Sequence, residues 1–372
     1  MRIPEIKEYL KTISPRRSVL ILGAPGIGKS VMVREFAEEE ARKLNLEFVD
    51  YSDEDYEDIK REPERYYVFA DFRLPETEPS DLLGVPRDVN NAVIYKPLLW
   101  AKAMSLVRYG MIFLDELTNV DRPDLQSVAY KLVLDRKAGF VKFSDGVRII
   151  AAGNRPDESA IAHPLPAPLT SRFHVIVADS PTIEEWSAWM DSHVGEWDKR
   201  VLGYLMRFRE DFIKLPDEPE TLEAYPTPRS WHWLAEELVK TPRKFWRPKA
   251  EGYVGREVAT RFVAFLETPI PDPEDLIKKP AVFAKLSLDT KYLATVIVGN
   301  HYVGEAKVSP KQLVPFLRVA MAEGGEFLAL FLMTIQSNRE KASELLATIM
   351  TDKDYRDLAE EIGNLGWFMM QA

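Results

Sequence analysis

The feature that most constrains this chain is the segment 23–30, whose sequence is GAPGIGKS. It matches G-x-x-x-x-G-K-[ST], a glycine-rich loop whose backbone N–H groups wrap around a phosphate. The residues before it, 19–22, are all apolar and are typical of a buried parallel strand. The residues after it carry Val33, Phe36 and Ala37 at helical spacing. A strand, a glycine loop and a helix in this order predict a P-loop in an α/β fold.

The residue types in this loop predict how it holds a nucleotide. Glycine lets the backbone approach a phosphate closely, and the N-terminus of the following helix favours negative charge. The lysine of the motif reaches the β- and γ-phosphates, and the serine hydroxyl suits Mg²⁺. We therefore expect ATP and Mg²⁺ as ligands, with the nucleotide bound by the whole loop: Gly23, Ala24, Pro25, Gly26, Ile27, Gly28, Lys29 and Ser30.

A second motif supplies carboxylates. Four apolar residues, 111–114, are followed by Asp115 and Glu116, which is the pattern of a Walker B strand. Phosphoryl transfer needs an aspartate beside Mg²⁺ and a group that orients or polarises the attacking water. We expect Asp115 to bind Mg²⁺ with Ser30 and to contribute to nucleotide binding, and Glu116 to activate water. Such a pair is common in α/β proteins, so the prediction depends on its combination with the P-loop.

A further apolar strand, 148–153, ends at Asn154. Ligands of open parallel sheets lie at the carboxyl ends of the strands, so this pattern predicts Asn154 beside the γ-phosphate. The alternative for Asn154 is a turn residue ahead of Arg155 and Pro156.

Other segments predict the elements between these motifs. We expect a strand at 66–70, a helix at 124–134 and a β-hairpin at 137–148 with its turn at 144–146. The acidic stretch 50–64 is typical of a solvated loop. Residues 85–96 have no helical period and interrupt a helix that begins near Ser80.

Composition excludes several classes. The chain has 372 residues, no cysteine and a formal net charge of −10. Disulfides, thiolate metal sites and cysteine nucleophiles are excluded, and the charge argues against general binding to nucleic acids or anionic membranes, although a local basic patch is compatible with it. Neither a signal peptide nor an apolar run of membrane-spanning length is visible. We expect a cytoplasmic protein that does not bind membranes.

Taken together, the motifs resemble those of AAA+ ATPases and, within them, of the MoxR-like branch. The resemblance covers about residues 1–267 and implies Mg²⁺-dependent ATP hydrolysis by a homo-oligomeric, hexameric ring. It also implies a chaperone-like role that remodels or activates a partner protein, in some cases one with a von Willebrand factor A domain. The matching segments are GAPGIGKS (23–30), SDLLG (80–84), FLDELTN (113–119), IIAAGNRP (149–156), LPAPLTSRF (165–173) and TPRSW (227–231).

The same resemblance assigns roles to single residues. It implies that Asn154 is sensor 1, that Arg172 is an arginine finger given to a neighbouring subunit, and that Arg229 is sensor 2. The segments 85–96 and 137–148 resemble loops that face the pore of a ring. Asn119 matches a polar position after the Walker B acids, and its role is open.

The two arginines can also be judged from their surroundings. Arg172 follows the proline-containing segment 165–170 and has no acid near it in sequence; the alternative is an ordinary surface arginine. Arg229 lies in the first turn of a helix that Thr227 can cap with Pro228 at its first position. A cation there is unfavourable with the helix dipole, which indicates a task such as pairing with phosphate.

The sequence predicts an α/β P-loop AAA+ domain at 1–179, an all-helical lid at 180–267 and a helical C-terminal region at 268–372. Three functions are compatible with it. The first is the ring-shaped ATPase that acts on a protein. The second is a DNA-directed AAA+ motor or loader, which the acidic balance disfavours. The third is a nucleotide-gated scaffold with little turnover, which an intact Glu116 disfavours.

Overall fold

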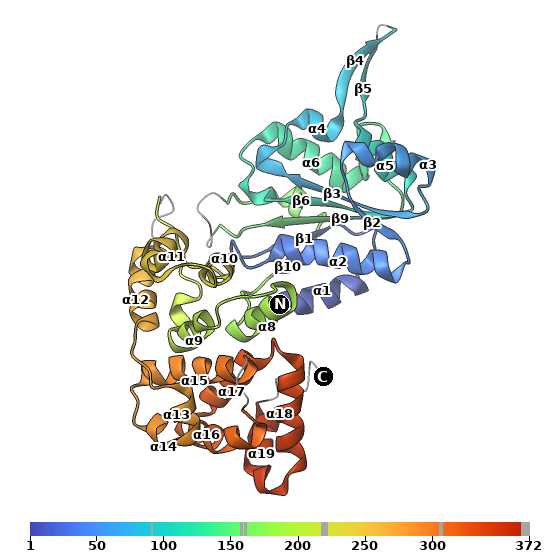
Figure 1. The fold of residues 1–372 in the computed structure, drawn as a ribbon. Helices are drawn as coiled ribbons and strands as arrows, with labels where there is room; N and C mark the ends of the chain where they lie inside the picture. The colour runs from blue at the N-terminus through green and yellow to red at the C-terminus, as the bar shows by residue number, and fades with distance from the viewer. Residues whose placement is uncertain (91, 157–158, 160–161, 217–221, 305–307, 366–372) are drawn as a thin grey trace. The chain divides into compact units, whose positions relative to one another are not determined.

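The computed structural model describes residues 1–90, 92–156, 159, 162–216, 222–304 and 308–365 (Figure 1). These residues form two compact units, one from Met1 to Ser180 and the other from Pro181 onward.

The first unit is built on a six-stranded sheet in which all neighbouring strands are parallel. The strand that precedes the P-loop has a neighbouring strand on each side. The buried strands are apolar runs because both faces of the sheet are covered. The expected fold class, an α/β P-loop domain with a parallel sheet followed by helical regions, is confirmed. In spatial order the strands are β10 (His174–Val177), β1 (Val19–Leu22), β9 (Gly146–Gly153), β6 (Tyr109–Asp115), β3 (Tyr66–Arg73) and β2 (Glu47–Asp50).

Helices cover both faces of this sheet (Figure 1). On one face, α1 (Ile3–Thr12) and α2 (Lys29–Lys43) bury an apolar cluster that takes Ile21, Phe69 and Phe113 from the strands. The residues that alternate with these side chains point to the opposite face and form a second cluster. That face is covered by α3 (Tyr56–Arg61), α4 (Pro79–Leu83), α5 (Leu99–Leu106) and α6 (Pro123–Asp135).

The prediction of a solvated loop at 50–64 is wrong. The segment contains the end of β2, a short 3-10 helix at Asp53–Asp55 and then α3. Ile59 is fully buried in the second cluster, with Tyr56 packed beside it. One buried aliphatic side chain therefore anchors a helix whose remaining residues are largely charged.

The first unit also contains two short antiparallel hairpins outside the main sheet. Residues of the 85–96 insert form the antiparallel strands β4 (Val85–Val89) and β5 (Ala92–Lys96). The expected second hairpin consists of β7 (Lys137–Ala138) and β8 (Val141–Lys142), so its existence is confirmed.

The turn of this second hairpin was predicted at the wrong place. It lies at Gly139, with φ +57°, and not at residues 144–146. A Cβ atom on Gly139 would lie 2.7 Å from the carbonyl oxygen of Leu83, so glycine is needed there for close approach as well as for the left-handed backbone. A turn does lie at 144–147, where the N–H of Val147 donates to the carbonyl oxygen of Ser144 at 3.2 Å, but it leads into β9 and does not close the hairpin.

The second unit is helical, and its described residues contain no strand. One apolar cluster runs from Ile183 to Ile362, so residues of the expected lid and of the expected C-terminal region share a core; the boundary at 267 stays a prediction. No helix in the described part of the chain is long and apolar enough to cross a membrane. The helices are α8 (Ile183–His193), α9 (Arg200–Arg207), α10 (Pro228–Leu238), α11 (Trp246–Val254), α12 (Arg256–Leu266), α13 (Pro273–Lys278), α14 (Ala281–Ala284), α15 (Leu288–Val303), α16 (Pro310–Glu323), α17 (Gly325–Ile335), α18 (Arg339–Thr351) and α19 (Arg356–Asn364).

A buried ion pair joins α2 to the sheet of the first unit. Arg148, on β9, donates from Nε to Glu40 Oε2 at 2.7 Å and from Nη2 to Glu40 Oε1 at 2.9 Å. The hydroxyl of Tyr67 donates to the same carboxylate, and Arg148 also donates to the carbonyl oxygen of Ile13. The pair therefore ties the helix that follows the P-loop to two strands and to the end of α1.

Replacing Arg148 by methionine should lower the free energy of unfolding by about 3 kcal/mol, because it leaves the Glu40 carboxylate partly buried without its cation. The double variant Arg148→Met/Glu40→Leu should recover most of this loss. Urea unfolding of the full chain measures both changes.

The exposed pair Arg34–Asp50 supplies the control, since both side chains are 47% exposed. Arg34→Met should cost less than about 1 kcal/mol. Equal losses for Arg34→Met and Arg148→Met would contradict the structural role of the buried pair.

Candidate active site

The P-loop connects the end of β1 to the start of α2. Gly26 and Gly28 have φ angles of +74° and +99°, which favour glycine. The N–H groups of Gly26, Ile27, Gly28 and Ser30 donate to no acceptor among the residues that the structure describes. Unsatisfied amides at the N-terminus of a long helix form a cradle for an anion, so this loop fits a phosphate.

Lys29 is buried, with 8% of its surface exposed. Its Nζ donates to the carbonyl oxygens of Gly23 at 2.7 Å and Ala24 at 2.8 Å, and to Asn154 Oδ1 at 3.0 Å. Gly23 is fixed in turn, since its N–H donates to the carbonyl oxygen of Gly153 at 3.2 Å. The structure therefore brings Lys29 and Asn154 into contact at the carboxyl ends of β1 and β9.

The two residues that the sequence predicted to hold Mg²⁺ are also in contact. Ser30 Oγ donates to Asp115 Oδ2 at 2.6 Å. A hydroxyl and one carboxylate suit Mg²⁺, which usually completes its octahedron with water and substrate phosphates. Among the described residues, no group of three or more His, Cys, Asp or Glu side chains could hold a metal. The donor set thus fits a nucleotide-bound Mg²⁺ and not a cation held by protein alone.

Glu116 has a constrained backbone and a fixed side chain. Its φ angle is +57°, and its N–H donates to Asp115 Oδ1 at 2.9 Å. Its Oε2 accepts a hydrogen bond from Asn119 Nδ2 at 2.9 Å. Asn119 Oδ1 is buried and has no hydrogen-bond partner among the described residues. Asn119, whose role the sequence left open, therefore holds the Glu116 carboxylate in place.

Thr118 is a residue of this site that the sequence did not single out. It is 3% exposed, and its Oγ1 accepts a hydrogen bond from the N–H of Asn154 at 2.7 Å. A Cβ atom on Gly153 would lie 2.7 Å from Thr118 side-chain atoms, so the two segments are in close contact. Thr118 fixes the position of Asn154. The sequence indicated Thr118 only as a polar residue directly after the apolar Leu117.

The predicted arginines lie outside this cluster of contacts. Arg172 follows α7 (Ala167–Thr170), is exposed, and donates to the carbonyl oxygen of Pro168. Arg229 is exposed in the first turn of α10 in the second unit and has no hydrogen-bond or ion-pair partner among the described residues. Their roles stay predictions.

Asp71, on β3, is a second acid that the sequence did not indicate. Arg73 of β3 pairs with Asp115 of β6 in the parallel register. Asp71 is two residues before Arg73, so its side chain lies on the same face of the sheet as that of Asp115. Desolvation and then the negative charge of Asp115 raise the pKa of the Asp71 carboxyl to about 6. Its side chain is still exposed by surface area, so solvent screening weakens this interaction.

Comparisons with known proteins were made for the whole chain. No protein-family model and no curated protein matches it. A structure of the ORC2 protein from Aeropyrum pernix, solved as ADPNP and ADP complexes, is 11% identical, with 91% of this chain and 94% of that chain covered and a TM-score of 0.40. A crystal structure of NtrX from Brucella abortus is 14% identical, with 98% of this chain and 68% of that chain covered and a TM-score of 0.32. Similarity at this level carries no conclusion about function, so function has to be inferred from the geometry of the site.

The raised pKa of Asp71 predicts how stability depends on pH. The folded chain retains this proton up to about pH 6, whereas the unfolded chain releases it near pH 3.9. The folded state therefore loses stability as the pH rises through this interval, and Asp71→Asn removes that loss. Urea unfolding without nucleotide should show Asp71→Asn more stable than the wild type at pH 7.5, by less than about 1 kcal/mol given its exposure, with a smaller gain at pH 4.5. An equal gain at both pH values would show that burial and Asp115 do not raise the pKa of Asp71 in the folded chain.

Proposed function

We propose that this protein is an AAA+ ATPase of the MoxR-like branch, which hydrolyses ATP with Mg²⁺ in a ring and remodels or activates a partner protein. One observation carries the ATPase proposal. Lys29 contacts Asn154, and Ser30 contacts Asp115, at adjacent carboxyl ends of the sheet. A P-loop lysine, a metal-binding pair and a polar strand end are thereby assembled around one loop.

The P-loop amides and Lys29 bind the phosphates of ATP. On binding, the Lys29 ammonium exchanges its bonds to the Gly23 and Ala24 carbonyl oxygens for phosphate oxygens, which are stronger acceptors. Ser30 and Asp115 would hold Mg²⁺, which neutralises charge on the phosphates when bound. The N-terminus of α2 adds its dipole to the same site.

Glu116 accepts the proton of the attacking water. Asn119 donates to Glu116 Oε2 and so fixes the direction of the carboxylate. The other oxygen, Oε1, has no contact with Asn119 and can accept the proton. Asn154, held by Thr118, orients the water or the γ-phosphate from the neighbouring strand. Catalysis here is positioning and electrostatic stabilisation by groups that are already in place.

The remaining charge at the γ-phosphate is neutralised by arginines. Arg172 is exposed, and among the described residues its side chain bonds only to the carbonyl oxygen of Pro168 in its own turn, so it is available to a neighbouring subunit in a closed ring. Arg229 would act as sensor 2 from the helical unit. The protein client, and a partner with a von Willebrand factor A domain, are proposed from the resemblance alone.

The ATPase proposal is tested with two variants. Lys29→Ala should weaken binding of a fluorescent ATP analogue at least about 100-fold, because the phosphates lose their buried cation. Glu116→Gln should bind the analogue like the wild type and lower single-turnover hydrolysis by at least about 100-fold, because the amide cannot accept a proton.

Lys131→Ala and Glu54→Gln, at exposed positions away from the loop, serve as matched controls and should change neither quantity. Normal turnover in Glu116→Gln would remove Glu116 from the role of base. Tight ATP binding without turnover in the wild type would favour the nucleotide-gated scaffold.

The ring proposal is tested by mixing subunits. Arg172→Ala and Lys29→Ala should each be nearly inactive alone, since a finger supplied in trans contributes about 10³–10⁵ in rate. In mixed rings some interfaces pair an intact Lys29 with an intact Arg172, so ATPase activity should partly return. The measurement is steady-state hydrolysis against the mixing ratio. A mixture as inactive as its parts, although mixed rings form, would show that Arg172 is not a finger in trans.

A further inference from the structure

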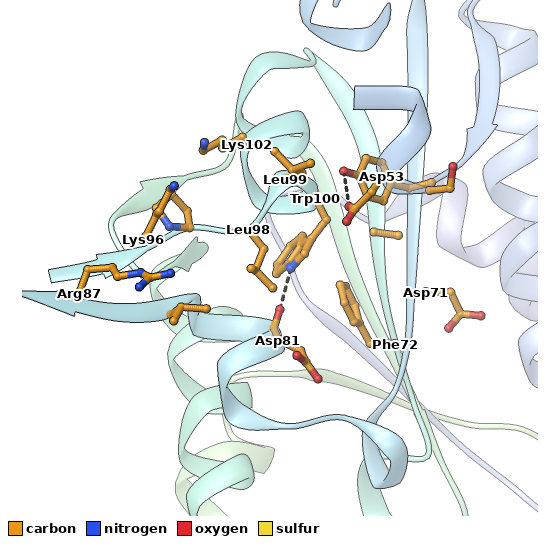
Figure 2. A pocket seen from close by; sticks show the side chains of 15 residues that line it. Asp53, Asp71, Phe72, Asp81, Arg87, Lys96, Leu98, Leu99, Trp100 and Lys102 are labelled. Carbon is orange, nitrogen blue, oxygen red and sulfur yellow. Dashed lines mark hydrogen bonds between the residues drawn. The ribbon is translucent and has the colours of Figure 1, made fainter. Parts of the chain in front are cut away.

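The first unit contains a cavity of about 550 Å³ that is lined by none of the P-loop residues. It lies where the base of the β4–β5 hairpin meets the start of α5 and the carboxyl ends of β2 and β3 (Figure 2). Its volume is in the range of small-ligand and peptide side-chain pockets. Nothing in the proposed ATPase mechanism uses it.

An aromatic pair forms the apolar part of this cavity. Trp100 is 5% exposed, and its ring meets Phe72 at 4.8 Å between centroids, with an angle of 63° between the planes. Trp100 Nε1 donates to the carbonyl oxygen of Asp81 at 2.7 Å, which fixes the indole (Figure 2). Leu98 and Leu99 complete this surface. The cavity therefore offers a rigid apolar floor to a side chain.

Three cations line the cavity: Arg87, Lys96 and Lys102. Arg87 and Lys96 share one face of the hairpin, because Arg87 pairs with Ile94 and Lys96 pairs with Val85 in the register. None of the three has a hydrogen-bond or ion-pair partner for its side chain among the residues that the structure describes. Unpaired cations around an apolar floor, in a chain with a net charge of −10, point to an anionic ligand.

Three acids also line the cavity: Asp53, Asp71 and Asp81. The Asp81 carboxylate already has a local donor, because its Oδ2 accepts a hydrogen bond from the N–H of Glu78 at 2.9 Å. Figure 2 shows Arg87 and Lys96 on one side of Trp100, and Asp53 and Asp71 on the other. Asp53 Oδ1 accepts a hydrogen bond from the Tyr51 hydroxyl at 3.0 Å, so this carboxylate already has a local donor. Two of the three acids therefore have local hydrogen-bond donors, whereas the side chains of Arg87, Lys96 and Lys102 have no partner among the described residues.

We propose that this cavity binds a short acidic peptide segment of a partner protein, with an apolar side chain against Trp100 and carboxylates at Arg87, Lys96 and Lys102. This inference rests on the proposed function, since it gives the partner its recognition chemistry. A peptide fits better than a nucleic acid, because a net charge of −10 disfavours a long polyanion more than a short segment with a few carboxylates. Carboxylates that alternate with an apolar side chain match the arrangement of cations and floor.

The test is fluorescence anisotropy of the full chain with the labelled peptide GSEDFEDSG. It should bind at least about tenfold more tightly than GSKKFKKSG, which reverses the charge, and than GSEDGEDSG, which lacks the apolar side chain. Equal binding of the three peptides would overturn the proposal.

The triple variant Arg87→Gln/Lys96→Gln/Lys102→Gln should weaken binding of GSEDFEDSG at least about tenfold. The control Arg17→Gln/Lys43→Gln/Lys131→Gln removes the same charge at exposed positions outside the cavity and should bind like the wild type. If both triple variants weaken peptide binding equally, the effect comes from the overall charge of the chain and the proposal is wrong. Thermal unfolding checks that the variants fold. If the triple variant does not fold, peptide binding is measured instead in the single variants Arg87→Gln and Lys96→Gln, which lie at exposed hairpin positions and should each weaken binding.

Two further measurements separate the alternatives. If an oligodeoxythymidylate binds more tightly than the peptide and loses affinity in the same triple variant, the cavity is a nucleic-acid site and the proposal is wrong. Peptide binding is also measured without nucleotide in Lys29→Ala, where it should persist. If the wild-type chain binds the peptide but does not hydrolyse ATP, only the ATPase proposal is wrong. If the wild-type chain hydrolyses ATP but does not bind the peptide, only the present inference is wrong.

Discussion

The bonds of the Lys29 ammonium are the contacts on which the rest of the site depends. A buried cation is costly unless it is paired or fully hydrogen-bonded. Lys29 satisfies this condition with two carbonyl oxygens of its own loop and the side chain of Asn154. The same three bonds close the loop on itself and join β1 to β9. The loop is therefore held in a conformation in which several backbone N–H groups have no acceptor among the described residues, as an anion site requires.

Those contacts explain why much of the site was predictable from the sequence. Strands β1, β6 and β9 are short apolar runs, and a parallel sheet brings their carboxyl ends to one edge. A polar residue at the end of such a run lies at that edge, as Asp115 and Asn154 do. Lys29 and Ser30 reach them because the P-loop leads from the end of β1 to the start of α2. The prediction required the P-loop motif, strand periodicity and the direction of the strands.

What the sequence did not predict depends on contacts between distant segments. Ile59 fixes α3 only because a core on that face of the sheet receives it, and a charged stretch gives no local sign of this. Gly139 forms the hairpin turn because Leu83 lies against it. Thr118 and Asp71 join the site through the neighbouring strands β9 and β6.

The strand β3 connects the two sites of the first unit. Adjacent residues of a strand face opposite sides of the sheet, so Asp71 and Phe72 point to different faces although they share one peptide bond. Asp71 interacts with Asp115 on the face that carries α2, whereas Phe72 packs against Trp100 on the face that carries α5. Asp71 and Phe72 both also line the cavity beside the β4–β5 hairpin. β3 therefore contributes residues to the sheet edge at Asp115 and to the cavity, and the two sites share one strand of a closely packed sheet.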